Sequence, residues 1–292
     1  MEVIIGIIGV IIALAIGIPT LKLQRRQTQL AESSASVPVK PHVDILDRLR
    51  VTKTVRIAYV HYPPFAIAPS NGDDEPSGLY VELIRFVCQA EGLQARFTQV
   101  RFSSAVQCIV DDQADIVLCI FQTIRRSHIV DFCAFMHTIS VSGVARTNED
   151  RVTSQADLLV HPFKFVVCRD EIGHELLSDQ FRVPPSHLTI IDTSNVADII
   201  AMVAMNKADL AIADSLSCQH GLAARGAEGP KLKPVLRQRP LYLCLNGVMI
   251  AKNQPSLASW LDSTLKAALR KEKFGTAEVA ILKEYGEIIG KL

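Results

Sequence analysis

One pattern, a helical segment followed by Ala-Asp and an apolar run, occurs once in each half of the chain. Residues 113–118 read Gln-Ala-Asp-Ile-Val-Leu, and residues 207–212 read Lys-Ala-Asp-Leu-Ala-Ile. Two copies are too few for a repeat array, and 292 residues can bury one or two ordinary cores. The pattern therefore predicts two similar α/β lobes.

Apolar runs of strand length alternate with segments of helical spacing along most of the chain. This alternation predicts a largely parallel sheet covered by helices on both faces, although it does not show how the chain passes between lobes. The predicted strands lie at 55–60, 96–100, 115–120, 163–168, 188–191, 210–212 and 241–250. The predicted helices lie at 80–91, 104–110, 173–181, 196–203, 257–269 and 277–288.

The amino-terminal region contains an almost unbroken apolar run from Val3 to Pro19. Its length is at the short end of what crosses a bilayer, so a cleaved signal peptide, a retained membrane helix and a buried core helix compete. A secretory signal needs a positive start, and here only Met1 and Glu2 precede the run. We expect a transmembrane helix or uncleaved signal anchor at residues 1–21 and a flexible polar tether at 22–43.

If this run is a membrane helix, the chain is a single-pass protein of the inner or cell membrane. The charges beside the run then predict on which side of the membrane the rest of the chain lies. Lys22, Arg25 and Arg26 follow the run and no basic residue precedes it, which favours a cytoplasmic location for the rest of the chain. The seven cysteines are odd in number and mostly lie in apolar segments, as expected for buried thiols in a reducing compartment.

A net charge of +1 without a basic block argues against nucleic acid as a partner.

The segment from Thr123 to Phe132 follows a buried-strand pattern and contains the Thr123 hydroxyl and two adjacent guanidinium groups. An arginine fork binds a carboxylate through two parallel hydrogen bonds, so the loop is suited to an anion; a solvated Arg-Arg pair is the alternative. Open α/β sheets bind ligands beyond the carboxyl ends of their strands, and Tyr62 and Asp214 also fall there.

Three motifs follow one another along the chain: Tyr-Pro-Pro-Phe at 62–65, Gly-x-x-x-Glu-Leu at 78–83 and Thr-x-x-Arg-x5-Phe at 123–132. Their order resembles the bacterial extracellular solute-binding proteins of family 3, the amino-acid receptors of ABC importers. The resemblance covers residues 54–290. It implies a periplasmic or extracellular location for the soluble part, opposite to the one that the charges and the cysteines favour, so the side of the membrane stays open. The resemblance also implies a two-lobed clamshell of the periplasmic-binding-protein type II kind, with a two-strand hinge and the ligand in the cleft. Lobe 1 would comprise residues 44–145 and 242–292, and lobe 2 residues 146–241.

The resemblance also assigns roles to individual residues. Arg126 would bind the ligand's α-carboxylate beside the Thr123 hydroxyl, and Asp214 would receive its ammonium group. Asp214 could instead cap a helix that begins at Ser215. Tyr62 and Phe65 would form an apolar wall or belong to the core. The expected ligand-binding residues are thus Tyr62, Phe65, Phe121, Thr123, Arg126 and Asp214.

Some of these positions depart from the family pattern. Phe121 and Cys119 stand where the family usually has small hydroxylic residues. Glu171 stands in a loop that usually reads Gly-Ser/Thr-Thr, and its carboxylate would repel the ligand's own. The alternatives to a standard amino-acid ligand are therefore a cationic, aromatic or peptide-like ligand, or a protein that has lost ligand binding.

Enzymatic chemistry has little support in the sequence. Cys168, Asp170 and His174 lie close together, but their spacing matches no cysteine-hydrolase signature and Cys168 ends an apolar strand. The eight histidines are scattered, so no metal site is expected, and no cofactor is expected either. Some relatives of the fold are dehydratases or lyases, but an enzyme is not the predicted function.

The predicted function is a membrane-tethered binding protein that delivers an amino-acid-like ligand to an ABC permease. The alternative is a ligand-sensing regulator with the same clamshell and a signalling partner.

Overall fold

The computed structural model describes residues 44–69, 75–225 and 231–292. Residues Asp44–Leu292 form one compact unit. The expected membrane helix at 1–21 and the tether at 22–43 lie outside the described residues. Among the helices that are described, none combines the length and the apolar character needed to cross a bilayer.

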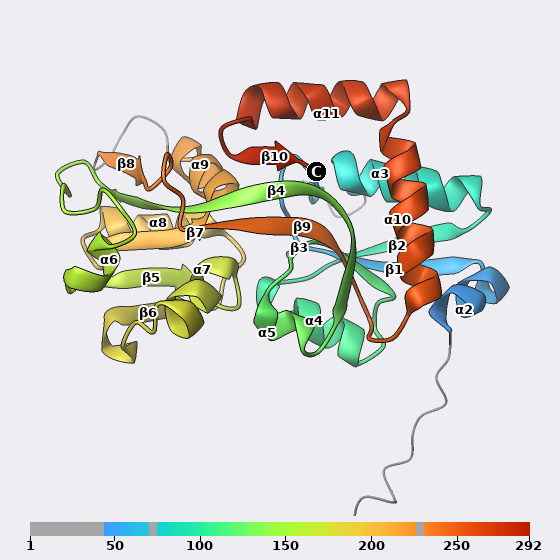
Figure 1. Ribbon diagram of the computed structural model, residues 1–292, viewed down its shortest axis with the longest axis horizontal. Coiled ribbons are helices and arrows are strands. Elements are labelled where there is room, and N and C mark those ends of the chain that lie inside the picture. The colour runs from blue at the N-terminus through green and yellow to red at the C-terminus, as the bar shows by residue number, and fades with distance from the viewer. Residues whose placement is uncertain (1–43, 70–74, 226–230) are drawn as a thin grey trace, which may run out of the picture. The chain divides into compact units, whose positions relative to one another are not determined.

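A mixed sheet runs through this unit in the order β2-β1-β3-β9-β4-β7-β5-β6, and β8 and β10 also pair with β4 (Figure 1). The strands at each end form a group of three in which paired neighbours are parallel. We call the half that contains the first group lobe 1 and the half that contains the second group lobe 2. The first group is β1 (Thr54–Tyr59), β2 (Gln94–Gln99) and β3 (Ile116–Phe121), and the second is β5 (Phe165–Cys168), β6 (Leu188–Ile191) and β7 (Leu210–Asp214).

Two long strands, β4 (Asp131–Arg146) and β9 (Tyr242–Ile250), join the lobes (Figure 1). β4 pairs with β9 between Asp131 and Val141 and with β7 between Val141 and Ala145, and both pairings are antiparallel. The prediction of a largely parallel sheet is therefore right for each lobe and wrong for the middle, where the chain crosses and returns. Because β4 belongs to both lobes, the residue boundaries given above for the lobes stay a prediction.

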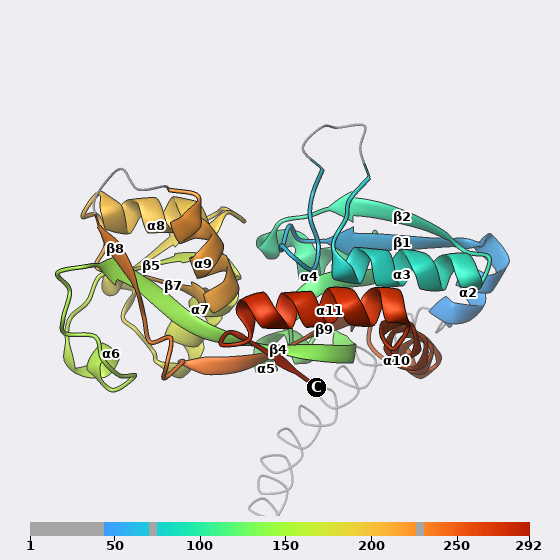
Figure 2. The same ribbon diagram turned by 90° about the horizontal axis from the view of Figure 1, so that it is seen from above.

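Helices cover both faces of the sheet (Figure 2). Along β1, Val55, Ile57 and Tyr59 belong to one core and Ala58 to another, because alternate residues of a strand point to opposite faces. The first core takes in α3 (Leu79–Ala90), α10 (Pro255–Leu269) and α11 (Glu272–Tyr285), and the second takes in α4 (Phe102–Val110) and α8 (Val196–Ala204). The shorter elements are α2 (Ile45–Thr52), α5 (Ile124–Ser127), α6 (Asp157–Val160), α7 (Ile172–Glu175), the π-helix η1 (Leu176–Gln180), the 3-10 helix η2 (Pro185–His187), α9 (Ser215–Ala223), β8 (Leu232–Val235) and β10 (Ile289–Lys291).

The repeated Ala-Asp motif has the same role in both lobes. Asp115 precedes β3, donates its N–H to the carbonyl of Arg56 (2.8 Å) and accepts the N–H of Arg56 on its carboxylate (2.8 Å). Asp209 precedes β7 and makes the same two contacts with Lys164, at 2.7 and 2.9 Å. Each carboxylate also pairs with an arginine, Arg56 at 2.6 Å and Arg146 at 3.1 Å. The motif fixes a strand against its neighbour in each half, which confirms the prediction of two similar lobes.

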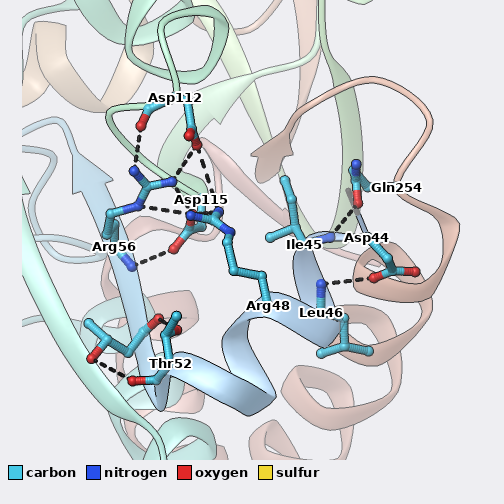
Figure 3. A network of polar contacts seen from close by, with 10 residues as sticks. Asp44, Ile45, Leu46, Arg48, Thr52, Arg56, Asp112, Asp115 and Gln254 are labelled. Atoms are coloured by element: carbon cyan, nitrogen blue, oxygen red, sulfur yellow. Dashed lines mark hydrogen bonds and ion pairs between the residues drawn. The ribbon is translucent and has the colours of Figure 1, made fainter. Parts of the chain in front are cut away.

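The first described helix, α2, is attached to lobe 1 by polar contacts (Figure 3). The Asp44 carboxylate caps its amino terminus, and the N–H of Ile45 donates to the side-chain oxygen of Gln254 at 2.9 Å. Arg48 forms an ion pair with Asp115, the same carboxylate that holds β3 against β1. The point at which the chain enters the unit is thus fixed to lobe 1.

The Tyr-Pro-Pro-Phe loop is positioned by the start of α3. The N–H groups of Leu79 and Tyr80 donate to the carbonyls of Pro64 (3.1 Å) and Phe65 (2.9 Å). Gly78 allows this close approach, because its φ is 104° and a Cβ atom there would lie 2.7 Å from the carbonyl carbon of Phe65.

Replacing Gly78 with alanine is therefore expected to lower the free energy of unfolding by about 1 to 3 kcal/mol from the backbone dihedral alone. The contact with Phe65 adds to this loss. Gly92→Ala is the matched control, because Gly92 has a φ of 65° and a Cβ atom added there would meet no other atom within 4 Å. Urea denaturation measures both, and equal losses would contradict a specific role for the Gly78 contact.

Candidate functional site

An aromatic cluster lies where lobe 1 faces lobe 2. Tyr62 follows β1 and Phe121 ends β3, and their rings meet edge to face with centroids 5.7 Å apart. Phe65 stacks with Tyr62 at 6.0 Å and also contacts Tyr80 and His137, at 4.8 and 5.1 Å. All five side chains are buried. Tyr62 reaches lobe 2, where its hydroxyl contacts Asp214, and Phe65 is fully buried in the core.

Arg126 connects the two lobes. Thr123 caps the amino terminus of α5 and accepts the N–H of Arg126 on its hydroxyl at 3.1 Å, which places the arginine on the first turn. The guanidinium donates to the carbonyls of Phe121 in lobe 1 (2.8 Å) and Asp170 in lobe 2 (2.5 Å). It also lies 2.7 Å from the carboxylate of Glu175 in lobe 2. Arg126 is thus a buried cation held from both sides.

Glu175 ends α7 and is a residue of the site that the sequence patterns did not single out. Its side chain is 6% exposed, and one oxygen, Oε1, pairs with Arg126. The other oxygen, Oε2, is buried without a hydrogen-bond partner among the described residues. The only signal in the sequence is its position four residues after Glu171, one helical turn further on.

Asp214 forms a second connection between the lobes. Its Oδ1 accepts the N–H of Ser217 at 2.9 Å, so the interpretation of Asp214 as the cap of α9 is confirmed. The same oxygen accepts the hydroxyl of Tyr62 across the interface at 2.7 Å. Its Oδ2 is buried and has no partner in the part of the chain that is described. The predicted contact with a ligand ammonium group stays a prediction.

Glu171 lies next to Asp214 and is held by the main chain. Its carboxylate accepts the N–H groups of Gly173 (2.6 Å) and Asp214 (3.1 Å). Burial, and next the charge of Asp214, raise the pKa of Glu171 to about 8. Burial likewise raises the pKa of Asp214. Among the described residues, the site therefore contains three buried carboxyl groups and the buried guanidinium of Arg126.

The floor of the site is formed by β9. Asn246 is the register partner of Phe121 and His137, so its side chain lies on the face of the sheet that carries the aromatic cluster. Both polar atoms of its amide are buried without a partner among the described residues. Cys244, two residues earlier, lies near Glu171 and Asp214, and its thiol pKa is raised by burial and then by their charges. Sequence patterns single out neither residue.

Two cavities flank this buried centre. One of about 350 Å³ lies between α5 and α7–η1 and is lined by Thr123, Glu175 and Tyr242, among others. The other, about 370 Å³, lies between the loop that contains Pro63 and helices α8 and α9. Arg125 borders the first cavity, with a side chain that is 54% exposed and 3.9 Å from Asp170. The second arginine of the loop is thus largely solvated.

The lobes also touch outside the centre. The Ser103 hydroxyl donates to Asp192 at 3.1 Å, and the N–H of Phe102 donates to the hydroxyl of Ser194 at 3.2 Å. On another side, His220 of α9 lies 3.1 Å from the Tyr285 hydroxyl of α11. Together with the Arg126 and Tyr62 contacts, these bonds hold the two lobes against each other.

Cys168, Asp170 and His174 do not form a nucleophilic arrangement. Burial raises the pKa of the Cys168 thiol, which keeps it protonated at neutral pH. The Nδ1 atom of His174 accepts the N–H of Asp170 at 3.0 Å, a bond that requires a neutral ring, and burial lowers the pKa of His174 accordingly. These residues shape the turn after β5. Across the described residues, no three His, Cys, Asp or Glu side chains gather as metal ligands would.

A family model for bacterial extracellular solute-binding proteins, family 3, matches residues 55–279. The chain belongs to this family. Family 3 consists of binding proteins, and the two-lobed fold described above is the one that the three motifs imply. Among curated protein sequences, no match was found.

Solved structures support the fold assignment of this family 3 protein. A histidine kinase sensor domain with similarity to periplasmic binding proteins has a TM-score of 0.65 at 22% identity, over 78% of this chain and 95% of that one. A cysteine-binding protein from Campylobacter jejuni has a TM-score of 0.67 at 16% identity, over 83% and 94%. A histidine-bound substrate-binding protein of an ABC uptake transporter from Streptococcus pneumoniae has a TM-score of 0.65 at 14% identity, over 79% and 92%.

Proposed function

We propose that this family 3 protein binds a small amino-acid-like solute between its lobes, with Asp214 receiving an ammonium group. The observation that carries the proposal is the fully buried Oδ2 atom of Asp214, which has no partner among the described residues. Burying a carboxylate oxygen without a donor is costly, so such groups are normally paired. A ligand ammonium group would supply the missing donor.

The surroundings of Asp214 agree with this role. Tyr62 and Phe121 offer an apolar wall on the lobe 1 side, and the Tyr62 hydroxyl already contacts Asp214. Contacts from both lobes would allow a ligand to stabilise the closed arrangement, because it would bind the closed form better than the open one. Phe65, Thr123 and Arg126 stay predicted members of the site.

Binding can serve delivery or sensing. We propose delivery to an ABC permease by a protein tethered to the membrane through residues 1–21, as the family resemblance implies. A sensing role is the second candidate, since the histidine kinase sensor domain has the same fold and the described cysteines are all buried free thiols. A reporter that is active only outside the cytoplasm, fused after Leu292, discriminates between them: activity supports delivery and inactivity supports cytoplasmic sensing.

The substitution Asp214→Asn tests the binding proposal. Asparagine keeps the oxygen that caps α9 but removes the charge, so stability should change little. Losing one partner of a buried charge pair typically costs about 2 to 5 kcal/mol, so affinity should fall at least roughly thirtyfold. Calorimetry with the amino acids and amines that raise the melting temperature of wild type measures this.

Asp214→Ala is the companion variant. It should lose the same affinity and, in addition, about 1 kcal/mol of stability through the lost cap. If Asp214→Asn binds as tightly as wild type, Asp214 is a cap alone and the proposed ammonium site is wrong.

A further inference from the structure

The contacts of Arg126 bear on the class of ligand. Two of its bonds go to main-chain carbonyls, and its charge is matched by the Glu175 carboxylate at 2.7 Å. An arginine that binds a ligand carboxylate offers its planar fork to that group. Here a carboxylate of the protein's own chain occupies that position, from the opposite lobe.

The remaining polar atoms of the site are mostly acceptors. With Arg126 paired to Glu175, neither Asp214 nor Glu171 has an ion-pair partner within the described residues. The unpartnered buried atoms at the centre are Glu175 Oε2, Asp214 Oδ2 and the amide of Asn246. Two carboxylate oxygens and one amide suit a ligand that donates hydrogen bonds and carries positive charge.

A ligand carboxylate would meet an unfavourable environment in the same place. To reach Arg126, it would have to displace Glu175 and leave that buried carboxylate without a cation. It would also lie near the carboxylate of Asp214, which has no ion-pair partner among the described residues. Burying an unpaired charge is strongly unfavourable. Displacing Glu175 from Arg126 would therefore cost free energy that no other contact described for the site offsets.

We propose that this protein binds an organic amine that lacks a carboxylate, with its ammonium group held by Asp214 and Glu175. This inference rests on the proposed function and narrows its ligand class. In effect, Glu175 supplies to Arg126 the carboxylate that an amino acid would bring. The cavity of about 350 Å³ that Glu175 lines provides space for the rest of the molecule.

Two matched pairs of compounds test the proposal. Agmatine differs from L-arginine, and cadaverine from L-lysine, only by the α-carboxylate. Calorimetry on the purified full-length protein should show each amine binding at least about tenfold more tightly than its amino acid, a difference of about 1.4 kcal/mol. Tighter binding of the amino acids overturns the inference and leaves the proposed function standing.

The variant Glu175→Gln tests the role of Glu175 itself. Glutamine keeps the size of the side chain but leaves the charge of Arg126 unpaired, so the preference should move at least about tenfold toward the amino acids. Glu149→Gln is the matched control, because Glu149 is a buried glutamate paired with Arg151 at 2.5 Å, away from the site. This control should keep the wild-type preference.

The outcomes separate the two proposals. A Glu175→Gln protein with an unchanged preference for amines overturns the inference. If none of the four compounds binds wild type or variant, both the inference and the proposed function fail. Should the variant not fold, the comparison of amine with amino acid on wild type decides the question.

Discussion

Replacing Arg126 with alanine is expected to lower the free energy of unfolding by about 3 to 5 kcal/mol. The side chain is 6% exposed and is the ion-pair partner of Glu175 at 2.7 Å. Its removal leaves that carboxylate buried and unpaired, and takes the donor from the carbonyls of Phe121 and Asp170. Urea denaturation at neutral pH measures the loss.

The neighbouring residue provides the control. Arg125 is 54% exposed and lies 3.9 Å from Asp170, so Arg125→Ala should cost less than about 1 kcal/mol. The double variant Arg126→Ala, Glu175→Ala should be more stable than Arg126→Ala alone, because it removes the unpaired carboxylate as well. An Arg126→Ala protein as stable as Arg125→Ala would show that the ion pair contributes nothing to the fold.

Stability is also expected to depend on pH through Glu171. Its pKa is raised from 4.5 to about 8 in the folded protein, by burial first and then by Asp214. Between these values the folded state holds a proton that the unfolded state has released. The stabilisation is therefore fully present below about pH 4.5 and is lost as the pH rises through 8, with a slope of up to about 1.4 kcal/mol per unit. Asp214, whose pKa burial also raises, acts in the same direction.

The variant Glu171→Gln isolates this contribution. Burial lowers the pKa of several histidines, which gives the opposite slope below their ordinary value of 6.5; they are His61, His137, His174 and His220. The difference between wild type and Glu171→Gln, measured by urea denaturation from about pH 4.5 to 8.5, removes their effect. Identical slopes for the two proteins would mean that Glu171 does not hold its proton in the folded state.

Much of the fold follows from local patterns in the sequence. Strands β1, β3, β5 and β7 are short apolar runs, and their existence and approximate bounds can be predicted. β4 could not be predicted, because its burial comes from different partners in the two lobes and leaves no simple alternation along Asp131–Arg146. The helix predicted at 173–181 is present but continues from α7 into the π-helix η1, a change that no residue pattern marks.

The residues of the candidate site that lie at the ends of strands could be predicted from the sequence. Tyr62, Thr123 and Asp214 follow or end parallel strands, so the topology brings them to one edge of each lobe. Glu175 and Asn246 were not predictable, since their importance comes from contacts with the other lobe and from strand register. A glutamate in a short helix is normally solvated, and only Arg126 across the interface gives it a role.

The attachment of α2 also determines which half of the protein can report on binding. Helix α2 joins lobe 1 through the contact of Ile45 with Gln254 and the ion pair of Arg48 with Asp115 (Figure 3). If the preceding residues are anchored, lobe 1 is the stationary half, and opening or closing about β4 and β9 displaces lobe 2. A partner that recognises lobe 1 alone would meet the same surface in both states. Only a partner that contacts lobe 2 would receive the information that a ligand has bound.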